Sequence, residues 1–125
     1  MERSSLTEQR NGDLLIAVRK GDLRKVKQLL KEGANIEYQD GRPLALASFN
    51  GHFFIVKHLV EHGANVHSHD DAALRLASEM NHPEVVRYLV ENGANVNADN
   101  GFSLKWARKN GNKEIVNFLL AHGAQ

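Results

Sequence analysis

A glycine-alanine pair recurs every 30 residues, at Gly33, Gly63, Gly93 and Gly123, and this spacing limits the fold more than any other feature of the chain. Residues 33–62 share 13 of 30 positions with residues 63–92, which share nine with residues 93–122, whereas roughly two are expected by chance. A repeat of this length indicates a stack of similar units, because one unit alone cannot bury its own apolar side.

Within each repeat the apolar residues follow a helical period twice. Leu44, Leu46 and Ala47 predict a short and mostly buried inner helix. Residues 53–60 then carry the apolar stripe of an amphipathic outer helix. Gly63 follows, and glycine ends a helix easily because it adopts a left-handed conformation without a Cβ penalty. Each repeat is therefore expected to be a helical hairpin.

Tight-turn dipeptides connect one hairpin to the next. Asp40-Gly41 and Asn100-Gly101 occupy equivalent positions, with Asp70-Asp71 as a weaker middle copy. We therefore expect an all-α solenoid of four stacked helix-turn-helix units with short β-turn tips. The predicted units are residues 13–42, 43–72, 73–102 and 103–125, after a polar N-terminal segment at residues 1–12.

Composition excludes several classes of function. The chain has 16 Lys and Arg against 15 Asp and Glu, a formal charge of +1, which argues against general nucleic-acid binding. Cysteine is absent, so disulfides, thiol catalysis and cysteine zinc sites are excluded. Apolar runs are too short to cross a bilayer. We expect a soluble, cytoplasmic protein, in its own cell or delivered into a host cell.

Three strings carry a family resemblance: GHFFIVKHLVEHGANV, NHPEVVRYLVENGANV and GNKEIVNFLLAHGA. They resemble the second half of ankyrin repeats, and the resemblance covers residues 13–124. Ankyrin repeats usually run about 33 residues, and the 30-residue spacing here is similar to the short repeats of giant-virus and some bacterial ankyrin proteins. The family's Thr-Pro-Leu-His opening is replaced by Arg42-Pro43-Leu44-Ala45 and its equivalents. We therefore expect shortened tips and a weak hydrogen-bond network between repeats.

The resemblance implies a protein-protein interaction scaffold that binds a partner protein through a concave groove of inner helices and turn tips. Carried over position by position, the predicted partner-binding residues are Arg19, Lys20, Tyr38, Gln39, Arg42, Phe49, Asn50, His69, Asp70, Arg75, Glu79, Met80, Asn100, Phe102, Lys105, Lys109 and Asn110. Aromatic side chains and Met in this set are the types that carry binding energy. Tyr38 and Phe102 have the alternative role of folding back over the shortened turns.

Charge is zoned along the chain, from +3 in residues 1–32 through −1 and −3 to +2 in residues 93–125. Such zoning would orient a partner with the opposite pattern. The basic ends also leave weak nucleic-acid binding as an alternative function. Phosphate-binding and nucleophile motifs are absent from the sequence. We therefore predict no enzyme activity, no cofactor, no small-molecule substrate and no membrane partner.

Residues 58–62 read H-x-x-E-H, a pattern that in some zinc proteases places two His on one helical face with Glu as the base. This makes a metal-dependent hydrolase the alternative enzyme hypothesis. The position of His62 is occupied by Asn92 in the next repeat, as expected for an exposed helix end, so we favour a coincidence of the repeat. His67 and His69 lie nearby, which leaves adventitious metal binding open. His52 and His82 are expected to form structural hydrogen bonds.

Overall fold

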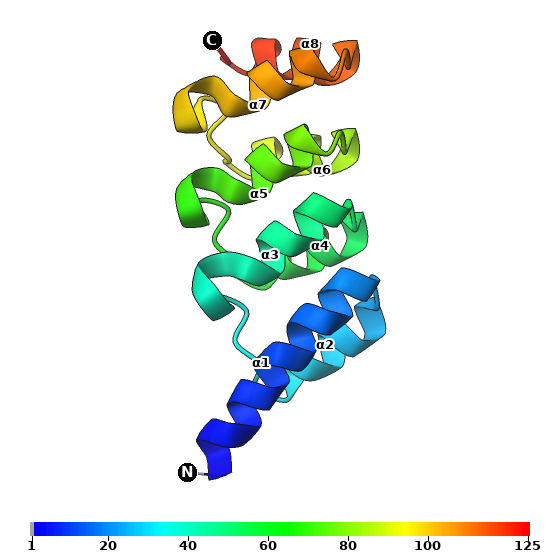
Figure 1. Ribbon diagram of the computed structural model, residues 1–125, viewed down its shortest axis with the longest axis vertical. Helices are drawn as coiled ribbons and strands as arrows, with labels where there is room; N and C mark the ends of the chain where they lie inside the picture. The colour runs from blue at the N-terminus through cyan, green and yellow to red at the C-terminus, as the bar shows by residue number, and fades with distance from the viewer. Residues whose placement is uncertain (1) are drawn as a thin grey trace.

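The computed structural model describes residues 2–125, with side chains from Ser5 onward, and forms eight helices and no strand in that range. Successive helices pair into four hairpins, which stack in chain order along the long axis of the molecule (Figure 1). The helices are α1 (Glu2–Lys20), α2 (Leu23–Lys31), α3 (Tyr38–Asn50), α4 (Phe53–Glu61), α5 (Ser68–Glu79), α6 (Pro83–Glu91), α7 (Ala98–Lys109) and α8 (Lys113–Ala121).

The hairpins form two layers. The inner helices α1, α3, α5 and α7 contact one another in order, and the outer helices α2, α4, α6 and α8 do the same. Between the layers lies one continuous core, in which Leu44, Leu59, Leu74 and Leu89 are completely or almost completely buried. Each hairpin covers the apolar side of its neighbour, as the repeat predicts.

The recurring Gly-Ala-Asn sequence ends the first three outer helices in the same way. Gly33 is left-handed, with φ 103°, and the Ala34 N–H donates to the Leu29 carbonyl at 3.0 Å. The Asn35 side chain accepts a hydrogen bond from the Glu37 N–H at 2.9 Å. The same bonds recur in the next two units, so this local geometry explains why the three residue types repeat.

The tips are short, as expected, and each is a three-residue left-handed turn at residues 39–41, 69–71 and 99–101. In the first of them the Gly41 N–H donates to the Glu37 carbonyl at 3.2 Å. Asp, Asn and Gly tolerate this conformation better than other residues, which explains the Asp-Gly and Asn-Gly dipeptides. The hairpin of α1 and α2 does not begin with such a tip, because α1 runs as one continuous helix through the polar segment that precedes the first predicted repeat.

Side chains tie each loop to the element before it. The Asn65 N–H donates to Glu37 Oε1 at 2.6 Å, and the Asn95 N–H donates to Asp71 Oδ2 at 2.6 Å. Asn11 and Asn97 form the corresponding bonds at the first and last loops. A hydrogen-bond network, which the sequence led us to expect to be weak, is therefore present along the whole row of loops.

Histidines connect neighbouring inner helices. His52 Nε2 lies 3.1 Å from the Arg19 carbonyl oxygen, and His82 Nε2 lies 2.9 Å from the carbonyl oxygen of Phe49. Since a carbonyl only accepts, Nε2 carries the proton in both rings. The predicted structural role of these two histidines is confirmed.

Candidate functional site

The candidate site is the inner face, which we define as the side of α1, α3, α5 and α7 turned away from the outer helices, together with the three tips. In α3, Leu44 and Ala47 point into the core, so helical spacing places Arg42, Leu46 and Phe49 on the opposite side. Equivalent positions of the other inner helices continue this surface from unit to unit.

One row of the inner face was expected in the core, and that expectation is wrong. Leu46 and its equivalent Leu76 are only half-buried, and Ile16 in the first unit is 43% exposed. Each residue turns a helix by about 100°, so Leu46 points away from the side that Leu44 buries. The row therefore adds apolar surface to the inner face.

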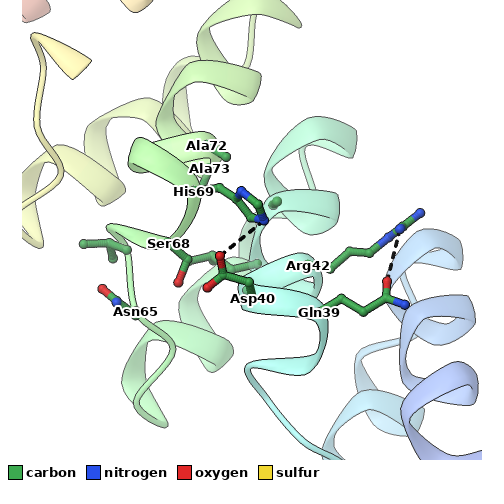
Figure 2. Close-up of a pocket in the computed structure, with 12 residues that line it drawn as sticks. Gln39, Asp40, Arg42, Asn65, Ser68, His69, Ala72 and Ala73 are labelled. Carbon is green, nitrogen blue, oxygen red and sulfur yellow. Dashed lines mark hydrogen bonds and ion pairs between the residues drawn. The ribbon is translucent and has the colours of Figure 1, made fainter. Parts of the chain in front are cut away.

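A pocket of about 410 Å³ opens between the tip at residues 39–41 and the tip at residues 69–71 (Figure 2). His69 Nε2 lies 3.3 Å from Asp40 Oδ2, and Arg42 donates to Gln39 at 3.1 Å. The small side chains of Ala45, Ala72 and Ala73 leave the space open. We refer to this space as the tip pocket. Because His69 and Asp40 are mostly exposed, solvent screens their attraction, and the pair contributes little to stability.

Arg75 joins the tip at residues 69–71 to the tip at residues 99–101. Its guanidinium donates to the carbonyls of His69 and Asp70 at 2.8 and 2.9 Å. It also lies 3.8 Å from the Asp99 carboxylate and 5.5 Å from the centre of the Phe102 ring. Arg75 is thus a structural brace whose donors are largely occupied, and Phe102 is half-buried beneath it.

Trp106 is the residue that the prediction missed. Its ring centre lies 6.0 Å from that of Phe102, and Lys109 Nζ lies 4.8 Å from the Trp106 ring centre. Cations over an aromatic face are attracted by its electron density. The signal was present in the sequence, because Phe102, Trp106 and Lys109 follow helical spacing on the side opposite Leu104.

Most of the other predicted partner-binding residues are accessible. Arg19, Lys20, Gln39, Arg42, His69, Asp70, Met80, Asn100, Lys105, Lys109 and Asn110 are exposed, and Tyr38, Phe49, Asn50 and Glu79 are half-buried. Phe49 is therefore less exposed than its sequence position suggested, and Phe102 and Trp106 are likewise half-buried. Asn110 is committed within the fold, since its amide donates to the carbonyls of Ser78 and Glu79.

The H-x-x-E-H string has a helix-capping geometry. His62 Nδ1 lies 2.8 Å from the His58 carbonyl, and the equivalent residues Asn92 and His122 form the same bond in their own helices. Burial, followed by the nearby His62 and Lys27, lowers the pKa of His58 from its usual 6.5. The part of the chain that the structure describes contains no group of three His, Asp or Glu side chains placed to hold a metal ion.

A comparison with protein families identifies the architecture. The model of a family described as ankyrin repeats (3 copies) matches residues 14–100 and 73–125. The chain belongs to the ankyrin repeat family. A search of curated proteins finds no match. Ankyrin repeats generally act as protein-protein interaction modules and are typically not catalytic. None of the helices described here is long and apolar enough to span a membrane.

Proposed function

We propose that this ankyrin repeat chain is a non-catalytic module that binds a partner protein through its inner face. The observation that carries the proposal is the half-buried aromatic pair of Phe102 and Trp106, which lies beside half-buried Arg75 of α5 and exposed Lys109 of α7. Tryptophan and arginine are enriched among residues that dominate binding energy at interfaces. A partner would cover this surface with an apolar or aromatic side chain.

The tip pocket supplies a second contact of different chemistry. Asp40 is its acidic side chain, and the lining also includes Arg42, His69, apolar Leu44 and Val66, and three alanines. A space of about 410 Å³ admits a single protruding side chain of the partner. We expect that side chain to be Lys or Arg, because Asp40 would then pair with it in place of His69.

Charge zoning is the third part of the proposal. Arg19 and Lys20 lie at one end of the inner face and Lys105 and Lys109 at the other, with Glu79 between them. Such an arrangement favours a partner that presents acidic ends and a basic middle, and it would mainly affect the association rate.

Affinity capture from a lysate of the source organism, read by mass spectrometry, tests the proposal. We expect Lys105→Glu with Lys109→Glu, both exposed, to lose the partner that the unmodified chain captures. Trp106→Ala should reduce the same capture, and circular dichroism verifies that the fold is retained. The control is Lys57→Glu with Lys113→Glu, which makes the same charge change on outer helices. Equal loss with the control, or no loss with either inner-face variant, would refute binding at the inner face.

A further inference from the structure

A second groove lies on the other layer of the molecule, between the outer helices α2 and α4. Its volume is about 890 Å³, roughly twice that of the tip pocket. Half-buried Leu30 and Ile36 form an apolar floor, and the rims are Lys27 and Lys31 of α2, His58 of α4 and His62, which caps the end of α4. We refer to this as the outer groove. Among the described residues that line it, none is acidic.

The other two boundaries between outer helices have acidic side chains. Between α4 and α6, Glu61 stands where Lys31 does in the first boundary, and its charge acts on Tyr88 across the boundary. Between α6 and α8, Arg87 is paired with Glu114. The repeat thus supplies its own carboxylates at the second and third boundaries. At the first boundary Glu32 bonds to Gln28 and the charge of Glu61 acts on His58, but neither carboxylate is among the residues that line the groove.

Local electrostatics agree with this reading. Burial is the main cause that lowers the pKa of His58, and the nearby His62 and Lys27 lower it further, whereas Glu61 has the smallest effect and acts in the opposite direction. An anion placed between the rims would be attracted by both helices. The apolar floor would at the same time favour a ligand that carries hydrocarbon beside its charge.

We propose that the outer groove binds an acidic peptide segment, with its carboxylates on Lys27 and Lys31 and an apolar side chain on Leu30 and Ile36. A peptide fits better than a nucleic acid, since a phosphodiester chain would leave the apolar floor uncovered and the whole chain has a formal charge of only +1. Phe54 is 69% exposed and lies one helical turn before His58, where it extends the apolar surface available to such a segment. This site is separate from the inner face.

The first test uses a fluorescent peptide built of repeated Glu-Glu-Leu triplets, with binding followed by anisotropy. We expect binding that weakens as salt is raised, because exposed charges are screened. A peptide with Gln in place of Glu should bind at least about tenfold more weakly, and so should one with Ser in place of Leu. Tighter binding of a single-stranded DNA of equal charge would refute a peptide site.

Variants locate the interaction. Lys27→Glu with Lys31→Glu should weaken the Glu-Glu-Leu peptide by at least about tenfold, since both side chains are exposed and the fold has no need of them. The matched control, Lys57→Glu with Lys113→Glu, has the same net charge and should bind nearly as well as the unmodified chain. An equal loss in both would mean that only net charge matters, and would overturn the proposal.

NMR separates the outer groove from the inner face. Peptide binding should shift the ring resonances of His58 and His62 and leave the indole resonance of Trp106, the only tryptophan, unmoved. Shifts at Trp106 without shifts at His58 would place the peptide on the inner face and refute the outer groove. Partner capture at the inner face is measured independently, so the two proposals fail or survive separately.

Discussion

At the scale of single residues, the loops satisfy the same backbone N–H with two different side-chain arrangements. Asp71 reaches the Asn95 N–H from the last position of its tip. Gly41 occupies the equivalent position in the unit before, and there Glu37, four residues earlier, reaches the Asn65 N–H. A Cβ on Gly41 would lie 2.6 Å from the Cβ of Ser68. In one loop Gly41 is paired with Glu37, which bonds to the Asn65 N–H. In the next loop Asp71 alone bonds to the Asn95 N–H.

Asp71→Ala should destabilise the fold by about 1–3 kcal/mol, because it leaves the Asn95 N–H without its acceptor. Asp70→Ala is the matched control, since Asp70 and Asp71 have nearly the same left-handed backbone, with φ 52° and 55°, and Asp70 is exposed. Backbone strain from alanine is then common to both, and the difference reports the side-chain bonds of Asp71, to the Asn95 N–H and to His67 Nδ1 at 3.0 Å. Urea unfolding measures it. Equal losses would show that Asp71 contributes only through its backbone conformation.

His58 should titrate below 6.5, with burial as the main cause and His62 and Lys27 adding to it. Its neutral form is favoured in the folded chain, so on acidification the unfolded chain takes up the proton first. His58 therefore has no effect on the free energy of unfolding well above pH 6.5, and it lowers that free energy as the pH falls through 6.5.

Lys27→Gln should raise the pKa of His58 towards 6.5, because one of the charges that oppose its protonation is removed. NMR titration of the imidazole protons gives the value directly. Lys57→Gln, on the same helix as His58, is the control and should leave it unchanged. A His58 pKa that does not move in Lys27→Gln would mean that Lys27 lies too far away to line the outer groove with it.

At the scale of helices and turns, the sequence predicted the outer helices better than the inner ones. An outer helix has one apolar side, and its Gly-Ala-Asn ending is set by local hydrogen bonds, so both are visible in the repeat. The continuous α1 was not predictable, because the polar residues before Asn11 give no apolar period.

The candidate site could be predicted only in outline. Helical spacing correctly placed Met80 and Lys109 on an exposed side of the inner helices. The bracing of Arg75 depends on carbonyls in the left-handed tip, and that turn conformation is not encoded by any single residue near Arg75. Trp106 was missed as a site residue because its equivalents in the earlier units, Ile16, Leu46 and Leu76, are aliphatic and resemble core residues.

Gly51→Ala should cost more than Gly63→Ala, although both glycines are left-handed. At Gly51 a Cβ would lie 2.5 Å from the His82 ring, whereas at Gly63 nothing lies within 4 Å. Gly63→Ala should therefore lower the free energy of unfolding only through backbone strain, by about 1–2 kcal/mol. Gly51→Ala should introduce the same backbone strain and also weaken the hydrogen bond from the His82 ring to the Phe49 carbonyl. Urea unfolding of the two variants compares them, and equal losses would show that the ring moves aside freely.

At the scale of the whole molecule, stability is shared along a line. Each hairpin packs against the hairpins next to it in the stack. A hairpin in the middle of the stack therefore has two neighbours, and the last hairpin has one. Leu74 of α5 and Leu119 of α8 are both completely buried, yet they differ in this respect. The same substitution at the two positions therefore tests how far one unit's loss is transmitted.

Leu74→Ala should lower the free energy of unfolding of the whole chain by about 2–5 kcal/mol, because the cavity lies where units on both sides depend on it. Leu119→Ala should mainly loosen α7 and α8, with a smaller change in the main unfolding transition, since the earlier units retain their contacts. Hydrogen exchange resolves the two effects: protection should fall throughout for Leu74→Ala and only near the C-terminal hairpin for Leu119→Ala. The control Leu120→Ala, at a position 43% exposed, should alter neither pattern. Identical exchange patterns for the two core variants would mean that the four hairpins unfold as one indivisible unit.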